Sequence, residues 1–464
     1  MNNIITTVKN IWNIKELRDK LILTFGLILV YRFATYISLP AINMFEVGNI
    51  LDKYKDAGGN DQTSGLLGLL SSFTGGAFSR ASIMALGVMP YISASIVIQL
   101  AGLAVPYFKK LQNEGESGRK TINQITRWLT IAICLFQAPT YLIGLTQGLI
   151  PVSEMGSAYL IHPDYQWFWF YVPSVIILTS GTLFTMWLGE RITENGIGNG
   201  ISILIMVGIL ADFPNSVIME FQGQSKMILF VLEIIFWLFV LLLSIVLVTA
   251  VRKVPVQYVS HIQKGGVNTA KSSLNAVRNF IPLKVNAAGV MPIIFAQALM
   301  FVPGLLGKTN DGETPTAFQH FMSGFSDMFS LQHNVLFAIM IIIFTYFYTA
   351  ISIPVNQMAD DLKRNGGLIP KVKPGIETAN FLDDILSKIT LPGAIFLAFI
   401  AIMPAIVHLI GLTETQNFAR FFGGTSLIIM VGVILDTVQQ INTYLLNHHY
   451  DGLMSSKLSR NLTN

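Results

Sequence analysis

Side chains that could carry out catalysis or hold a cofactor are few in this 464-residue chain. The single cysteine, Cys134, excludes an internal disulfide and any CxxC motif, and His408 alone of seven histidines lies in an apolar segment. Neither HExxH nor GxSxG occurs, and Gly307-Lys308-Thr309 lacks the glycine that begins a phosphate-binding loop. The run from Gly196 to Gly200 has the wrong spacing for a dinucleotide site and indicates a turn that opens a helix. We therefore expect no catalysis, no metal and no cofactor.

Ionisable side chains inside apolar segments would point to an ion-coupled transporter, which places charged groups near the middle of the membrane. Here the apolar segments contain Arg32, Glu233 and Asp436, scattered along the chain and without an obvious partner. A solute transporter built from inverted repeats is one alternative, and a passive insertase or assembly scaffold is another. Aliphatic helices interrupted by proline and glycine instead favour a pore that apolar residues seal.

The composition predicts that these segments lie in a membrane. Only 12% of the residues are charged and 52% are hydrophobic, whereas soluble proteins average about 25% charged residues. A soluble chain of this length would form about three domains and would need far more charge to cover their surfaces. The composition therefore argues against a water-soluble enzyme and favours a polytopic membrane protein.

Ten segments approach the length of about 20 mostly apolar residues that a bilayer-crossing helix needs. They are Leu21–Leu39, Ala81–Val105, Ile122–Gln147, Trp167–Gly189, Ile197–Val217, Ile228–Val251, Val285–Leu306, Val335–Ile353, Ile389–Leu412 and Phe421–Ile441. An even number of spans puts both termini on one side. Most of the 30 Lys and Arg residues lie in alternate connections and in the two tails, so the positive-inside rule places both termini in the cytoplasm.

Three connections between these spans are long. Arg252–Lys284 and Pro354–Lys388 are basic and cytoplasmic, and long loops are usually functional or disordered. Anionic lipid and an acidic or RNA-bearing cytosolic partner both suit their charge, and the sequence does not separate the two. The outer connection Leu39–Arg80 ends in an apolar stretch, Ser64–Phe73, that is too short to cross the bilayer. Such a stretch indicates an interfacial or re-entrant helix.

Two segments carry a more specific pattern: residues 82–100, SIMALGVMPYISASIVIQL, and residues 187–205, WLGERITENGIGNGISILI. Both resemble the signature segments of the SecY family, the central subunits of bacterial protein-conducting channels. Supporting matches lie at residues 72–81, 114–120, 282–292 and 422–429. The resemblance implies an all-α membrane protein with ten transmembrane helices in two pseudo-symmetric five-helix halves around a central pore, with a short plug half-helix.

The resemblance also implies a division of the chain. Residues 1–217 would form the N-terminal half, with the plug at about 64–74. Residues 218–284 would form the sixth span and the first basic loop, and residues 285–444 the last four spans with the second basic loop at 354–388. Residues 445–464 would form a cytoplasmic tail.

By resemblance, a ring of aliphatic side chains seals the pore. Its six members are Val88 and Ile92 in the second span, Ile201 and Ile205 in the fifth, Ile294 in the seventh and Ile429 in the tenth. The first two pairs are spaced i,i+4, which puts each pair on one face of its helix. Such a collar offers ions and water no hydrogen bonds, yet it can flex around an extended polypeptide.

The resemblance also assigns a plug and a lateral gate. Gly65–Phe73 corresponds to the plug that fills the outer funnel of the idle pore, and its members include Gly65, Leu66, Leu69 and Phe73. Spans two and seven correspond to the gate, where Gln99 and Asn286 match polar positions. Hydrogen bonds between membrane helices contribute about 0.6–2 kcal/mol, enough to bias a closed gate, and static attachment of two helices is an equal alternative.

The two basic loops match those that receive the ribosome or the SecA motor ATPase. Their implied docking residues are Arg252, Lys253, Lys264, Lys271, Lys363, Arg364, Lys371 and Lys373. The other implied partners are the SecE and SecG subunits, signal sequences, unfolded polypeptides and lipid of the bacterial plasma membrane. The family usually has arginine where this chain has Lys373, and it has a Glu-Arg pair where this chain has Arg252-Lys253. Lysine lacks the planar fork of arginine, so we expect contacts with the motor to differ in detail.

Overall fold

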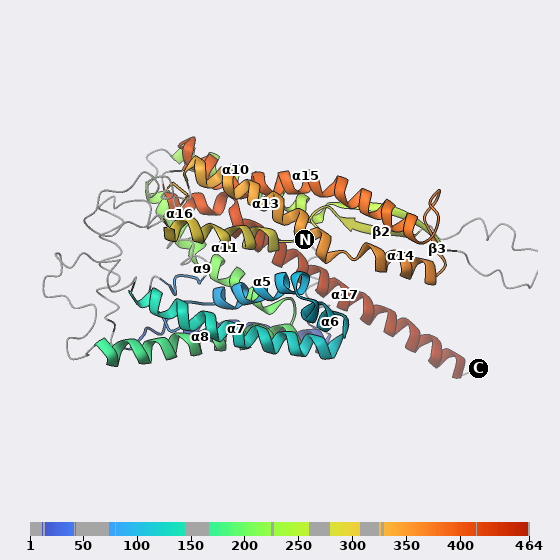
Figure 1. Cartoon of the computed structure of the whole chain (residues 1–464), viewed down its shortest axis with the longest axis horizontal. Helices are drawn as coiled ribbons and strands as arrows, with labels where there is room; N and C mark the ends of the chain where they lie inside the picture. Colours follow the sequence, from blue (N-terminus) through green and yellow to red (C-terminus); the bar gives the residue numbers. More distant parts are fainter. Residues whose placement is uncertain are drawn as a thin grey trace, which may run out of the picture. The chain divides into compact units, whose positions relative to one another are not determined.

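The long apolar segments are helical in the computed structural model, which describes residues 12, 14–40, 42, 74–78, 80–143, 167–223, 227–258, 279–306, 324–325, 329–413 and 415–462 (Figure 1). Within these residues, six helical stretches are long and apolar enough to cross a membrane: Phe168–Asn195, Gly200–Gly223, Met227–Thr249, Leu331–Arg364, Ile376–Leu409 and Gly424–Leu446. A seventh candidate is a pair of helices bent by 101°, α5 (Met89–Ala104) and α6 (Pro106–Asn113). The chain is therefore a multi-pass membrane protein, and the count of ten spans stays a prediction.

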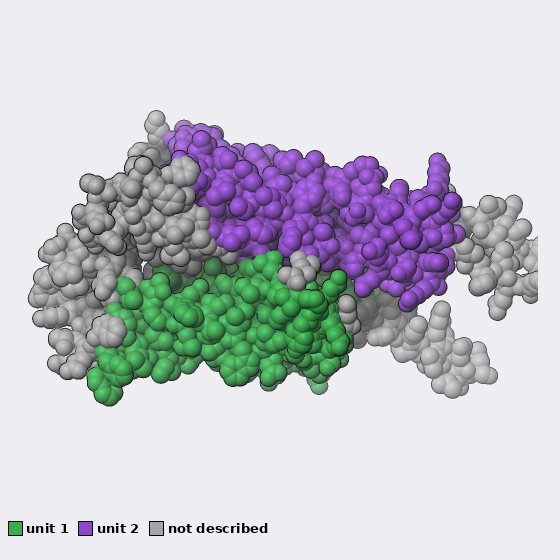
Figure 2. Space-filling model, in the orientation of Figure 1, with its two compact units in different colours: residues 1–218, 433–464 green, residues 219–432 purple. Residues whose placement is uncertain are grey.

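The chain divides into two compact units (Figure 2). Unit 1 consists of residues 1–218 and 433–464, and unit 2 of residues 219–432. The division falls within the helices α9 (Gly200–Gly223) and α17 (Gly424–Leu462). The domain boundaries drawn from the sequence stay a prediction.

Unit 1 is built from α2 (Lys15–Ala34), α5, α6, α7 (Glu116–Ile143), α8 (Trp167–Asn195) and most of α9 and α17. Helices α7 and α8 run side by side (Figure 1), with Leu142 and Leu178 fully buried in one core cluster. An ion pair also joins the two helices: Arg127 Nη2 of α7 lies 2.6 Å from Glu190 Oε2 of α8. The bend between α5 and α6 follows from Pro106, because a proline disfavours helical geometry in the residue before it, and Val105 is extended.

Helix α5 begins at Met89, later than the expected start of the second span at Ala81. The residues before it form turns, and Gly87 among them adopts a φ of +54°, which a regular helix does not contain. Pro90 lies in the first turn of the helix, where a proline is well accommodated. Hydrogen bonds join this turn region to the segment that follows α2: the Leu39 N–H donates to the Ala81 carbonyl and the Ile83 N–H donates to the Ile37 carbonyl, both at 2.9 Å. The second span thus begins with an irregular segment that is anchored by its backbone.

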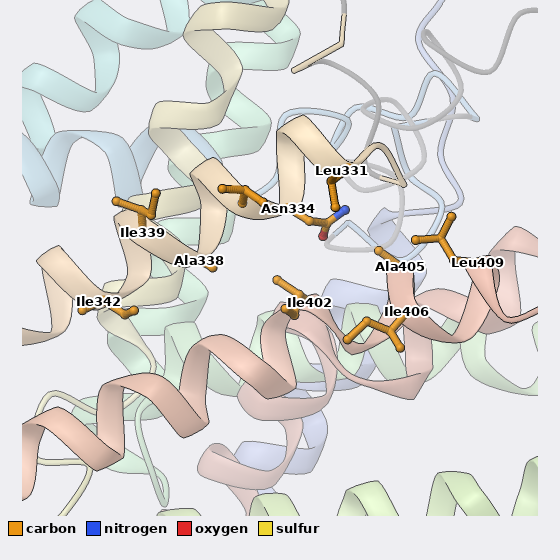
Figure 3. Close-up of a pocket in the computed structure, with 10 residues that line it drawn as sticks. Leu331, Asn334, Ala338, Ile339, Ile342, Ile402, Ala405, Ile406 and Leu409 are labelled. Carbon is orange, nitrogen blue, oxygen red and sulfur yellow. The ribbon is translucent and has the colours of Figure 1, made fainter.

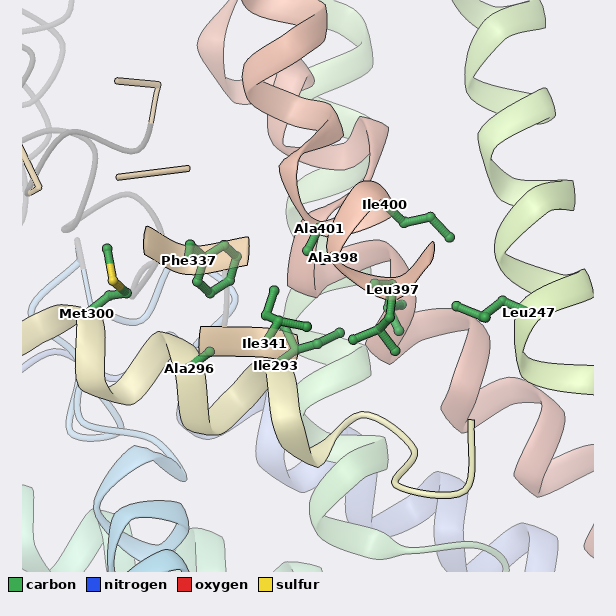
Figure 4. Packing of buried hydrophobic residues seen from close by; sticks show 11 residues of the cluster. Leu247, Ile293, Ala296, Met300, Phe337, Ile341, Leu397, Ala398, Ile400 and Ala401 are labelled. Atoms are coloured by element: carbon green, nitrogen blue, oxygen red, sulfur yellow. The ribbon is translucent and has the colours of Figure 1, made fainter. Parts of the chain in front are cut away.

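Unit 2 has its apolar core where four helices meet: α10 (Met227–Thr249), α11 (Met291–Leu306), α13 (Leu331–Ser352) and α15 (Ile376–Leu409). The core cluster contains Ile293 of α11, Ile341 of α13, and Leu397 and Ile400 of α15, all with no exposed surface (Figure 4). Ala296 lies among them, and a side chain this small lets α11 lie close against its neighbours. The short helices α16 (Gln416–Ala419) and η3 (Arg420–Phe422) join α15 to α17.

The two basic loops of unit 2 contain a small folded element. Strands β1 (Val251–Tyr258), β2 (Asn279–Lys284) and β3 (Gly367–Leu368) form an antiparallel sheet in the order β2-β1-β3, with Val254 opposite Ile281 and Gln257 opposite Leu368. The sheet shares an apolar cluster with α14 (Val355–Arg364) and with the first turns of α15. The members of this cluster are Val254, Val256, Leu283, Leu362, Ile369, Leu382 and Leu386. Helix α15 therefore begins at Ile376, before the expected ninth span, because Leu382 and Leu386 of its early turns pack in this cluster.

Candidate pore, gate and docking sites

The start of α5 positions the first two residues of the predicted ring. Val88 is the N-cap of α5 and is buried, and the Ile92 N–H donates to the Val88 carbonyl at 3.0 Å. This bond is the helical i to i+4 bond, so the two side chains share one face of the first turn, as the spacing predicts.

The start of α9 positions the second pair. Helix α9 begins at Gly200, so Ile201 and Ile205 lie on its first two turns, where Ile205 is buried. The preceding run from Gly196 is a turn that opens a helix, as expected. A Cβ added at Gly189 of α8 would lie 2.7 Å from Ile201 Cγ1, and one added at Gly200 would overlap the Gly189 carbonyl oxygen. The two glycines therefore let α9 begin directly against α8.

The last two ring residues lie in unit 2. Ile294 is half-buried on α11, and Ile429 on the first turns of α17 is only 2% exposed. Burial alone fits both a pore seal and ordinary packing. The closed ring of six side chains stays a prediction.

The two predicted gate residues differ in their hydrogen bonding. On α5, the Gln99 Nε2 donates to Ser95 Oγ at 3.1 Å, one turn earlier on the same helix. Asn286 is 6% exposed in the bend between β2 and α11, and its Oδ1 accepts no hydrogen bond from any residue that the structure describes. Gln297 of α11, which we did not assign to the gate, is also buried, and its Oε1 likewise lacks a donor within the described residues. A buried acceptor without a donor costs about 1–3 kcal/mol. Each of these two amide oxygens would therefore gain stability from a hydrogen-bond donor.

Two arginines meet at the backbone carbonyl of Gly75, which follows the predicted plug in the sequence. The Arg32 Nη1 of α2 donates to the Gly75 carbonyl at 3.0 Å, and the Arg80 Nη2 donates to the same oxygen at 2.6 Å. Both guanidinium groups also face the ring of Tyr36, at 5.3 Å and 4.5 Å. The sequence flagged Arg32 only as an isolated charge in a span, and nothing in its spacing indicates this contact. The plug residues Gly65, Leu66, Leu69 and Phe73 lie outside the described residues.

The predicted docking residues that the structure describes are all exposed and belong to the folded element of unit 2. Arg252 and Lys253 lie on β1, Lys363 and Arg364 end α14, and Lys371 and Lys373 follow β3. Lys253 Nζ lies 4.7 Å from the centre of the Phe280 ring on β2. The Lys373 side chain is 83% exposed, and its Nζ lies 3.7 Å from Glu377 Oε1. Lys264 and Lys271 lie outside the described residues.

A groove of about 270 Å³ lies between α13 and α15 in unit 2 (Figure 3). Its lining is almost wholly aliphatic, with Ile339 and Ile342 on one side and Ile402 and Ile406 on the other. The ten lining residues include no charged side chain. A solute site would need several convergent polar groups, so this groove gives a solute transporter no binding site.

Comparisons with known proteins agree with the fold and with the signature segments. A family model described as SecY matches residues 82–438. The protein translocase subunit SecY of Streptomyces coelicolor is 38% identical over 442 residues, which cover 95% of this chain and 97% of that protein. A solved structure whose description states that the plug domain of SecY stabilises the closed channel aligns with a TM-score of 0.56, at 16% identity over 92% of both chains.

The fold is shared more widely. An idle yeast Ssh1 complex bound to the yeast 80S ribosome aligns with a TM-score of 0.57 over 91% of this chain and 89% of that one, at 15% identity. The helical channel fold expected from the sequence is thus confirmed, with the small sheet of unit 2 in addition. The resemblance carried by residues 82–100 and 187–205 is confirmed as well. By the extent of the family match and the identity to curated relatives, this chain belongs to the SecY family.

Proposed function

We propose that this chain is the pore subunit of a protein translocase, which conducts unfolded polypeptides across the bacterial plasma membrane and releases hydrophobic segments sideways into lipid. The observation that carries the proposal is its match to proteins named translocase subunit SecY over 95% of its length. The chain is a channel and not an enzyme, so ATP hydrolysis belongs to a partner motor. The inverted-repeat transporter is not favoured, since the curated relatives are translocase subunits. Of the three ionisable residues in the expected spans, Asp436 is exposed, Arg32 donates to a backbone carbonyl and Glu233 is buried.

Reconstitution tests this function directly. The purified protein, with the subunits that accompany it, is placed in lipid vesicles and supplied with an unfolded preprotein and the motor ATPase. We expect the preprotein to become protected from external protease only when its signal sequence is intact. Uptake of small solutes by vesicles that hold no protein substrate would instead favour the transporter.

Within this function, the six ring residues form the seal, and spans two and seven form the gate. The buried Oδ1 of Asn286 supports the gate, because a polar group without a donor favours a rearrangement that supplies one. Gln99 already uses its amide within α5, so we expect it to contribute less than Asn286.

The plug assignment predicts a leak when the plug is removed. Deletion of Gly65–Phe73 is expected to raise the resting ion conductance in planar bilayers by roughly tenfold, since an apolar obstruction blocks ions by excluding water. The matched control is deletion of Asp52–Asn60, a polar segment of equal length in the same outer connection. Equal conductance of the two deletion variants would remove the plug from the proposal.

The partners that we propose are the SecE and SecG subunits, the SecA motor and the ribosome, with both termini in the cytoplasm. A fold neighbour is described as bound to a ribosome, which supports docking on the cytoplasmic side. The exposed basic residues of the folded element in unit 2 provide a surface for an acidic or RNA-bearing partner. Steering of this kind acts on association rates and weakens with salt.

Reversal of one charge tests the docking surface. Lys373→Glu is expected to lower motor- or ribosome-dependent export by roughly tenfold at low ionic strength, by repelling the partner. Its exposed pair with Glu377 contributes little to stability, so folding should be unaffected. The control is Lys388→Glu: Lys388 of α15 is 73% exposed and also pairs with a carboxylate one turn away, that of Asp384. Normal export by Lys373→Glu at low salt would exclude Lys373 from docking.

A further inference from the structure

The turn between α8 and α9 is held through its backbone by side chains from distant parts of unit 1. The Ile197 N–H donates to Thr24 Oγ1 of α2 at 3.1 Å, and the Gly198 N–H donates to Gln440 Oε1 of α17 at 2.8 Å. A third bond comes from α8, where Thr193 Oγ1 accepts the Gly200 N–H at 2.9 Å. The Gly200 N–H belongs to the first turn of α9, where backbone N–H groups have no partner within the helix. Ile197 and Gly198 lie just before that turn, so the three side chains together hold the connection that leads into α9.

Of the three side chains that accept these bonds, Thr24 is the most buried, at 8% exposed. Its hydroxyl uses both of its functions, since it accepts from Ile197 and donates to the Lys20 carbonyl at 2.8 Å. A Cβ at Gly196 would overlap Thr24 Oγ1, so the turn approaches the hydroxyl as closely as only glycine permits. Gly198 has a φ of +82°, a conformation that fits glycine.

Helices α2 and α17 also contact each other directly, through Lys20 and Tyr444. Lys20 Nζ donates to the Tyr444 hydroxyl at 2.7 Å and lies 4.5 Å from the centre of its ring. The hydrogen bond to Tyr444 raises the pKa of Lys20 above its ordinary value. The turn is therefore fixed between two helices that are themselves tied together.

We propose that Thr24, assisted by Gln440, is a positioning residue that sets the rotation and height of α9 and so aims Ile201 and Ile205. Helix α9 begins directly after the turn, and Ile201 is its second residue. A displacement of the turn would pass to both side chains, because a helix moves as a rigid element over its first turns. The role in sealing rests on the proposed pore, whereas the role in placing α9 does not.

The test compares two equally conservative substitutions in the purified channel with its accompanying subunits. Thr24→Val removes the hydroxyl that holds the turn. Thr130→Val is the matched control, since Thr130 of α7 is also buried and its hydroxyl donates only to the Thr126 carbonyl one turn before it on the same helix. Two quantities are measured: hydrogen exchange of the amides in residues 196–203, and the resting ion conductance in planar bilayers.

We expect Thr24→Val to speed amide exchange at Ile197 and Gly198 by about tenfold, the effect of one lost hydrogen bond, and to raise resting conductance. Thr24→Ser keeps the hydroxyl and should restore both values, and Thr130→Val should change neither. Gln440→Met, at an exposed position, should give a smaller change in the same direction and serves if Thr24→Val does not fold. Unchanged exchange in Thr24→Val, or changes matched by Thr130→Val, would overturn the proposal.

A third measurement separates this inference from the pore assignment. In a Cys134→Ala background, the variant Ile205→Cys reports the aim of α9 through the rate at which its thiol reacts with a small thiol reagent. We expect Thr24→Val to change that rate. If Ile205→Asn left the conductance unaltered while Thr24→Val changed the rate, Ile205 would not belong to the seal, but Thr24 would remain a positioning residue. An unaltered rate in Thr24→Val would show that the turn does not aim α9.

Discussion

Replacement of Ile429 by asparagine is expected to open an ion leak and to relax the requirement for a good signal sequence. Ile429 is 2% exposed on the first turns of α17. An amide in an apolar constriction gives water and ions a hydrogen-bonding partner, which favours wetting of the closed pore. We expect the resting conductance to rise by about tenfold or more. We also expect the variant to export a preprotein that carries a defective signal sequence. Planar-bilayer recording and a protease-protection assay measure the two effects.

The neighbouring residue supplies the control for this prediction. Ile428 has no exposed surface and belongs to the core cluster of unit 2. A buried amide without partners costs about 1–3 kcal/mol, so Ile428→Asn should lower the melting temperature at least as much as Ile429→Asn. Only the variant at 429 should leak. Equal leaks from both would mean that loosened packing, not a lost seal, admits the ions.

The helices were largely predictable from the sequence, whereas their first turns were not. A run of about 20 apolar residues has few alternatives to a helix in a membrane, which is why α8, α10 and α13 lie where hydropathy places them. The start of α5 depends on Gly87 and Pro90, which lie inside an apolar run and leave the hydropathy unchanged. The extension of α15 towards Ile376 depends on the packing of Leu382 and Leu386 against the sheet, a contact that no local pattern reveals.

The sheet itself left a weak signal. Val254 and Val256 of β1 are buried, whereas Lys253, Pro255 and Gln257 are exposed, which is the alternation of a half-buried strand. The run is short and contains Pro255, which argues against a central strand. The sequence therefore indicates a basic loop at this position, and the folded element was not expected.

The candidate site came from the resemblance rather than from physical reasoning about single residues. An isoleucine at position 205 or 429 suits a core as well as a pore, since both environments are apolar. The contacts of Arg32 with Gly75 and of Thr24 with Ile197 join residues far apart in the chain, through single hydrogen bonds to the backbone. Such bonds leave no periodic pattern, so only the structure reveals them.

Gly200→Ala is expected to be among the most damaging single substitutions in unit 1, because the new methyl group would overlap the Gly189 carbonyl oxygen and lie 2.7 Å from Ile192 Cβ. Neither α8 backbone nor a Cβ can yield by a change of rotamer, so α9 must move away from α8. Overpacking of this kind costs about 3 kcal/mol, and the displaced helix carries Ile201 with it. We therefore expect a clear fall in the melting temperature of the purified protein together with a higher resting conductance.

Gly26→Ala is the matched control, a glycine-to-alanine change that should not lower the melting temperature. Gly26 lies within α2, and a Cβ there would meet nothing within 4 Å. Alanine favours a helix over glycine by about 1 kcal/mol, so this variant should melt at the same temperature as the parent or slightly higher. If the two variants melted alike, the close approach of α8 and α9 would not exist in the protein, and Ile201 would owe its position to something other than the two glycines.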